Sequence, residues 1–225
     1  MQTDIRRPLI ILWLLGIAAG VAITPYMREI GLVPSGLSDA KVAIKIALQS
    51  ALIYGLVAFL SYHLIQRTDL KPFGQIKPIS ALLAGSFVAA ILWLSGRLFF
   101  ADSPLNQLFS TKLSALLACF YGAINEEMLC RLLLLSALYL LFSKLLNKRS
   151  VTLWIATIIS SLLFGVGHLP AARMLAPLTT PEVARILLLN GVAGTVFGYL
   201  YFSRGIYTSM LAHFITNVLL KVVLN

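Results

Sequence analysis

The sequence predicts an all-α membrane protein, a polytopic bundle of about seven transmembrane helices that forms a single membrane domain over residues 1–225. Hydrophobic residues make up 59% of the chain and charged residues 12%, which lies well outside the usage of soluble globular domains. The apolar residues also fall in runs close to the ~20 residues that cross a bilayer as a helix. These runs are 8–26, 44–64, 79–100, 113–142, 151–168, 183–202 and 205–224.

The first run follows a short basic start that contains Arg6 and Arg7. A basic start before an apolar stretch also occurs in cleaved signal peptides. The run from Pro8 to Thr24 is long for the core of such a peptide. We therefore expect an uncleaved first span.

The fourth run, 113–142, is too long for a helix that crosses the bilayer perpendicularly. It is expected to be strongly tilted, or broken near Gly122 into an additional, eighth element. It holds both cysteines, Cys119 and Cys130. If the helix is continuous they lie roughly 16 Å apart along its axis, too far for a disulfide.

The last three runs carry two further features. The segment Leu169–Pro181 contains three prolines and is expected to be irregular, either as a connector or as a lid over a cavity. Gly194 and Gly198 form a small-xxx-small face on which another helix can pack closely. Tyr201, on the same run, is a candidate hydrogen-bond donor.

The basic residues give the expected orientation. With seven spans, one side of the membrane receives Arg6, Arg7, Arg67, Lys71, Lys77, Lys144, Lys148, Arg149 and Arg204. Positive loops are usually cytoplasmic. We therefore expect a multi-pass protein of the cell membrane with a cytoplasmic N-terminus. Since the net charge of +10 is accounted for mostly by residues at the ends of spans, we expect no nucleic-acid partner.

Three charges interrupt the fourth run, in the stretch AINEEMLCRLLLL. A charge at mid-membrane costs about 2.5–3.5 kcal/mol on insertion scales, so Glu126, Glu127 and Arg131 need compensation. Glu127 and Arg131 are four residues apart and are expected to form an ion pair. Glu126 points about 100° away on an α-helix, which suggests a polar cavity with other partners.

Suitable partners lie on later spans. His168 ends the fifth run, and His213 and Asn217 share a helix face in the last. With Glu126 they are expected to converge on one cavity, although counting along straight helices places Glu126 and His168 roughly 25 Å deep and His213 only about 12 Å deep. His63, near a basic loop, is expected to be an ordinary packed histidine.

These residues resemble the signature of the CPBP family of CAAX proteases and bacteriocin-processing enzymes, also called the Abi family. The resemblance covers 111–225, while 1–110 carries no motif. The matching residues are Glu126-Glu127-xxx-Arg131, Phe164-xxx-His168 and His213-xxx-Asn217. Leu132 departs from the pattern, since many relatives have glycine there; this bears on substrate preference more than on chemistry.

The resemblance implies an intramembrane endopeptidase of the glutamic type, without a cofactor or metal, that cleaves a peptide or protein presented at or in the membrane. Glu126 would activate a water molecule, which His168 would help to position. His213 and Asn217 would stabilise the oxyanion. Glu127 and Arg131 would order the site.

Three other readings of the same residues are open. Glu and His sets can hold zinc, so a zinc-dependent protease is one alternative, although the spacing is not HExxH. A transporter or proton relay would also place Glu and His inside the membrane, but the internal repeats expected of a transporter are not evident. An inactive binding or immunity protein is the third.

Overall fold

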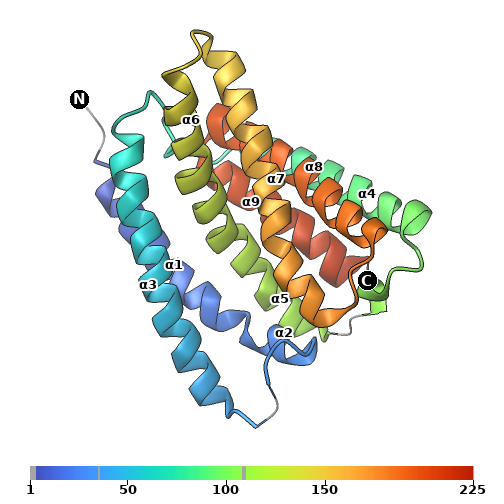
Figure 1. The fold of residues 1–225 in the computed structure, drawn as a ribbon. Helices are drawn as coiled ribbons and strands as arrows, with labels where there is room; N and C mark the ends of the chain where they lie inside the picture. The colour runs from blue at the N-terminus through green and yellow to red at the C-terminus, as the bar shows by residue number, and fades with distance from the viewer. Residues whose placement is uncertain (1–3, 35, 108–109, 225) are drawn as a thin grey trace.

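The computed structural model describes residues 4–34, 36–107 and 110–224. Within these ranges the chain is helical and contains no strand, so the predicted all-α bundle is confirmed (Figure 1). The α-helices are α1 (Arg6–Ala22), α2 (Thr24–Glu29), α3 (Asp39–Ile65), α4 (Pro78–Phe99), α5 (Lys112–Tyr121), α6 (Ser136–Ser143), α7 (Arg149–Leu175), α8 (Thr180–Arg204) and α9 (Ile206–Val218).

Each predicted apolar run corresponds to a helical segment. In the described chain six segments are long and apolar enough to cross a membrane: 6–29, 39–65, 78–99, 149–175, 180–204 and 206–223. Large apolar side chains point outward from them, such as Leu52 at 79% exposure and Ile79 at 74%. Such exposure is expected where lipid, not water, surrounds the protein. The chain is a multi-pass membrane protein.

The remaining predicted run, 113–142, is fourth in chain order. It is helical without interruption from Lys112 to Ser143, because two π-helical stretches, Gly122–Glu126 and Met128–Leu135, join α5 to α6. Of the two expected alternatives, the break near Gly122 with an eighth element is therefore wrong, and the run is one continuous helix. A π turn accommodates an extra residue within a continuous helix, and such turns are frequent at functional sites. Cys119 and Cys130, within this helix, are free and buried.

The expectation of an irregular segment at 169–181 is wrong for most of its length. Helix α7 continues through Pro170 to Leu175, and only 176–179 separate it from α8. A proline inside a helix removes one backbone hydrogen bond without necessarily ending the helix in a membrane protein. The side chain of Thr179 caps α8 by accepting a hydrogen bond from the Glu182 backbone.

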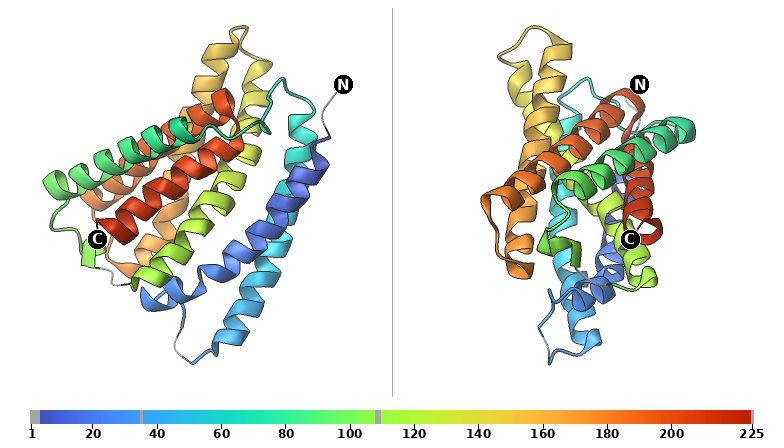
Figure 2. Two further views of the ribbon diagram at one scale, coloured as in Figure 1. Left: turned by 180° about the vertical axis from the view of Figure 1, so that it is seen from behind. Right: turned by 90° about the vertical axis from the view of Figure 1, so that its right-hand side faces the viewer.

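Helix α1 packs mainly on α3, α7 on α8, and α4 on α9 (Figures 1 and 2). The predicted packing role of the two glycines on α8 is confirmed. A Cβ atom on Gly194 would lie 2.8 Å from Ser161, and one on Gly198 would lie 2.5 Å from Thr157, so α8 approaches α7 too closely for larger residues.

Candidate active site

A cavity of about 620 Å³ opens between the helices. Its walls come from the end of the first span, the second half of α4 and the segment after it, the first half of the 112–143 helix, the second half of α7, the first two-thirds of α8 and the last helix from His213 onward. All of these segments lie at the end of the bundle where the first span finishes. Glu126, His168, His213 and Asn217 all line this cavity. The structure therefore brings together the four residues predicted to be catalytic.

Glu126 lies between the two imidazoles. One carboxylate oxygen is 3.7 Å from Nε2 of His213, and the other is 4.0 Å from Nε2 of His168. The depths counted along straight helices differed by more than 10 Å, but the helices are inclined to one another, which removes the conflict (Figure 2). Glu126 retains 24% side-chain exposure, so it faces the cavity instead of the packed interior.

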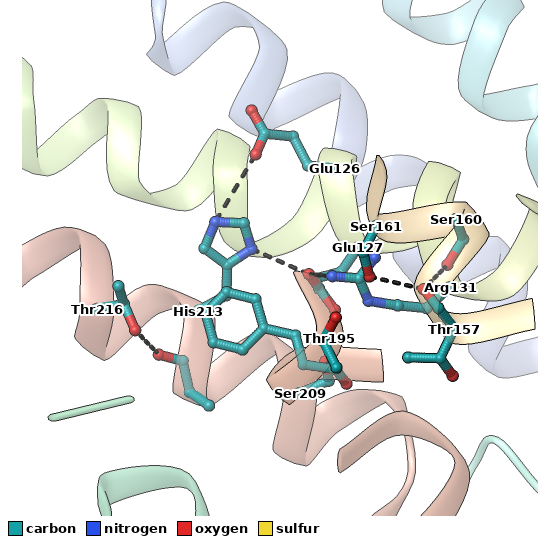
Figure 3. A network of polar contacts seen from close by, with 12 residues as sticks. Glu126, Glu127, Arg131, Thr157, Ser160, Ser161, Thr195, Ser209, His213 and Thr216 are labelled. Atoms are coloured by element: carbon teal, nitrogen blue, oxygen red, sulfur yellow. Dashed lines mark hydrogen bonds and ion pairs between the residues drawn. The ribbon is translucent and has the colours of Figure 1, made fainter. Parts of the chain in front are cut away.

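Glu127 is buried and makes different contacts. It pairs with Arg131 at 3.3 Å, which confirms the predicted ion pair, and accepts a hydrogen bond at 3.0 Å from Nδ1 of His213 (Figure 3). The hydroxyl of Ser209 donates to its other oxygen. The sequence-based reasoning missed Ser209; the available signal was its position four residues before His213, on the same helix face.

The ring of His213 is fixed by a stacking contact and by its hydrogen bond to Glu127. It stacks on Phe197 with the centroids 4.6 Å apart, and the Ser209 oxygen lies 2.8 Å from the Phe197 carbonyl oxygen, which is an alternative acceptor for the Ser209 hydroxyl proton. With Nδ1 directed at Glu127, Nε2 faces Glu126 and the cavity.

His168 is fixed by its own helix. Its Nδ1 lies 2.9 Å from the backbone carbonyl of Phe164, and the two rings meet edge to face at 4.5 Å. A carbonyl only accepts hydrogen bonds, so Nδ1 carries a proton and donates. In the neutral ring Nε2 is then a free acceptor directed at Glu126.

Asn217 approaches Glu126 because residue 122 is glycine. A Cβ atom at Gly122 would lie 2.5 Å from Nδ2 of Asn217, 3.3 Å from Nε2 of His213 and 3.5 Å from a carboxylate oxygen of Glu126. The first π stretch begins at this residue. Three of the four candidate catalytic groups thus meet above the bare backbone of Gly122.

Other candidate residues lie elsewhere. His63 is near the end of α3, packs edge to face on Phe59 and Tyr62, and does not line the cavity. Tyr201 is buried, and its hydroxyl is 2.8 Å from that of Ser136, so it is a structural residue. Leu132 is buried in the core. The residue that departs from the family pattern therefore does not line the cavity.

Residues of the N-terminal half also line the cavity, although no sequence motif predicted this. Tyr26, Trp93 and Arg97 line the cavity together with the C-terminal residues. Among the residues that the structure describes, no three His, Cys, Asp or Glu side chains are grouped closely enough to hold a metal ion.

Comparison with known proteins fits this geometry. Residues 108–219, about half of the chain, match the sequence model of the family described as type II CAAX prenyl endopeptidase Rce1-like. This chain belongs to the Rce1-like family. The matched segment contains Glu126, Glu127, Arg131, His168, His213 and Asn217, and it indicates a membrane peptidase of the CAAX type. No curated protein and no solved structure matched the chain.

Proposed function

We propose that this Rce1-like protein is an intramembrane endopeptidase in which Glu126 activates water to hydrolyse a peptide bond of a membrane-associated or lipidated substrate. The observation that carries the proposal is the placement of Glu126 between two Nε2 atoms at 3.7 and 4.0 Å in a cavity. Both distances exceed a direct hydrogen bond. They suit a water molecule about 2.8 Å from each partner.

The attacking water sits between Glu126 and His168. Glu126 takes its proton as general base, and the acceptor Nε2 of His168 aligns it. The water oxygen then adds to the scissile carbonyl. Proton transfer from Glu126 to the leaving amine breaks the tetrahedral intermediate and regenerates the carboxylate.

His213 and Asn217 stabilise the oxyanion of that intermediate. This role requires both ring nitrogens of His213 to carry protons, so that Nδ1 donates to Glu127 and Nε2 to the oxyanion, while the Asn217 amide donates from the same side above Gly122. Each donor of this kind contributes roughly 10²–10³ to the rate. Arg131, at 0% side-chain exposure, pairs with Glu127 at 3.3 Å, so the pair acts through His213 and not on the substrate.

The proposed location is the cell membrane with a cytoplasmic N-terminus. The first span enters at the basic end, and the cavity lies at its other end, among residues such as Ser110, Arg185 and Lys221. In this orientation the cavity opens on the non-cytoplasmic side, from which the substrate is presented.

The test is to compare membrane proteomes of strains carrying wild-type protein and Glu126→Gln, scoring new peptide termini. Peptides cut in the wild type are expected to remain uncut in the variant. Asp102→Asn is the matched control, because Asp102 is an exposed acid at the same end of the bundle. Equal cleavage in all three strains would contradict the proposal.

A chelator added to purified protein separates the glutamic mechanism from a zinc-dependent one. Full activity after dialysis against a strong chelator is expected for the proposed mechanism. Loss of activity that zinc restores would instead support the metal-dependent alternative.

A further inference from the structure

Three basic side chains line the cavity. Arg97, Arg185 and Lys221 belong to its walls, whereas Glu126 is the only acidic residue that lines it in the described chain. A cleft with one sign of charge and apolar walls concentrates ligands of the opposite sign. This cavity therefore suits a substrate that carries a negative group at some distance from the scissile bond.

The three basic side chains differ in the groups that they already contact within the protein. Arg185 lies 3.7 Å from the Glu182 carboxylate and donates to Asn106 at 2.6 Å, so its charge is compensated. Arg97 lies over the ring of Trp93, 5.7 Å from the centroid. Lys221 lies 4.9 Å from the centroid of Tyr26 and makes no ion pair within the described residues.

Lys221 is also the cation placed in line with the candidate catalytic residues. His213, Asn217 and Lys221 follow one another at intervals of four on the last helix, and all three line the cavity. The eight steps from His213 to Lys221 rise about 12 Å at the α-helical value; the last of them fall in the π-helical stretch Leu219–Val223. An extended peptide advances about 3.3 Å per residue, so a peptide laid along this helix from His213 reaches the level of Lys221 within three to four residues.

We propose that Lys221 is a specificity-determining residue that binds a carboxylate of the substrate three to four residues from the scissile bond. This inference rests on the proposed function. Tyr26 forms one side of the subsite and holds the ammonium over its ring. The carboxylate is supplied either by a nearby peptide C-terminus or by an Asp or Glu side chain. Lys221 lies outside the segment matched by the family, 108–219.

A lysine in the last turn of a membrane helix also has an ordinary role, since it reaches the interface and stabilises the helix end. That role does not depend on the substrate. It predicts that substitution changes the yield or stability of the protein and leaves discrimination between substrates untouched. The experiment therefore compares matched ligands instead of one ligand.

The measurement is the affinity of the Glu126→Gln protein, reconstituted in nanodiscs, for a fluorescent farnesylated peptide ending in a CAAX sequence. Binding needs no turnover, so the result does not depend on the proposed catalytic role of Glu126. Three forms of the peptide are compared: the free acid, the C-terminal amide, and an amide with Asp in place of the last residue.

The free acid is expected to bind roughly ten- to a hundredfold more tightly than the amide, as for a charge-assisted hydrogen bond. Recovery of affinity by the Asp peptide amide assigns the subsite to any nearby carboxylate; no recovery assigns it to the C-terminus. Adding Lys221→Met is expected to remove the difference between acid and amide, while Lys221→Arg preserves it. Lys112→Met is the control, because Lys112 is exposed at the same end and does not line the cavity.

Equal affinity for acid and amide, including no measurable binding of either, would overturn the proposal, as would an unchanged preference in Lys221→Met. Neither result bears on the proposed peptidase function, because that function is tested separately by the Glu126-dependent cleavage described above. If instead the acid is preferred through Lys221 and Glu126→Gln does not alter proteolysis, the subsite stands and the catalytic assignment fails.

Discussion

Substitution of Gly122 by alanine tests the oxyanion donors without changing either of them. The added Cβ would lie 2.5 Å from Nδ2 of Asn217, about 0.9 Å short of the 3.4 Å at which ordinary contact begins. The contact is with the end of a side chain, so the Asn217 amide moves and the backbone does not. The fold is expected to tolerate Gly122→Ala.

The expected cost is kinetic. A displacement near 1 Å of a group in the reacting constellation lowers the rate about 10²-fold, and complete loss of one oxyanion donor costs 10²–10³ in kcat. We therefore expect Gly122→Ala to reduce kcat by about 10²-fold with little change in KM. The assay is cleavage of an internally quenched peptide by purified protein in liposomes, with thermal unfolding of the same samples.

Gly96→Ala is the matched control. Gly96 also lines the cavity and also lies in a helix, but a Cβ atom there meets no atom within 4 Å. This variant is expected to keep full activity and to gain some stability, since alanine costs less conformational entropy in a helix than glycine. If Gly122→Ala were as active as Gly96→Ala at equal stability, Asn217 would not be an oxyanion donor.

Two further predictions concern the buried ion pair and the orientation. Glu127→Gln leaves Arg131 as an uncompensated buried charge, so the free energy of unfolding is expected to fall by about 3–5 kcal/mol, measured by denaturant unfolding in detergent micelles. A reporter enzyme active only outside the cytoplasm, fused after Asn225, is expected to be active, because seven crossings from a cytoplasmic N-terminus place the C-terminus on the far side.

Each of these has a direct comparison. Asp39→Asn breaks an exposed ion pair with Arg28 in which Asp39 is 84% exposed; it is expected to cost at most about 1 kcal/mol. A similar small loss for Glu127→Gln would mean that Arg131 is compensated by other groups. An inactive reporter at the C-terminus, with an active one fused between α7 and α8 at Leu178, would contradict the odd number of crossings.

The helices were predictable because apolar runs of membrane length have few other structures open to them. Local geometry was not. The π stretch that starts at Gly122 changes how successive side chains are placed around the helix, and no composition signal marks it. Pro170 suggested a helix end, yet packing of α7 in the bundle retains the helix to Leu175.

The site residues that could be predicted are those connected with charges inside an apolar run. Glu126 and Glu127 inside an apolar run require partners, and His213 is such a partner for both. Ser209 was missed because serine is common and inexpensive in membrane helices. Tyr26 and Trp93 were missed because aromatic residues in a span carry no sign of which cavity they line; only the packing of the first four helices brings them there.

The central claim is that the Glu126 carboxylate activates water for peptide hydrolysis. Its most direct measurement is the single-turnover rate of peptide cleavage by purified, reconstituted Glu126→Gln beside wild type, at matched folding and with saturating substrate. The amide cannot accept the proton from water, so a loss of 10²-fold or more in the cleavage rate is predicted, with substrate binding preserved. Cleavage by Glu126→Gln at the wild-type rate would contradict the account.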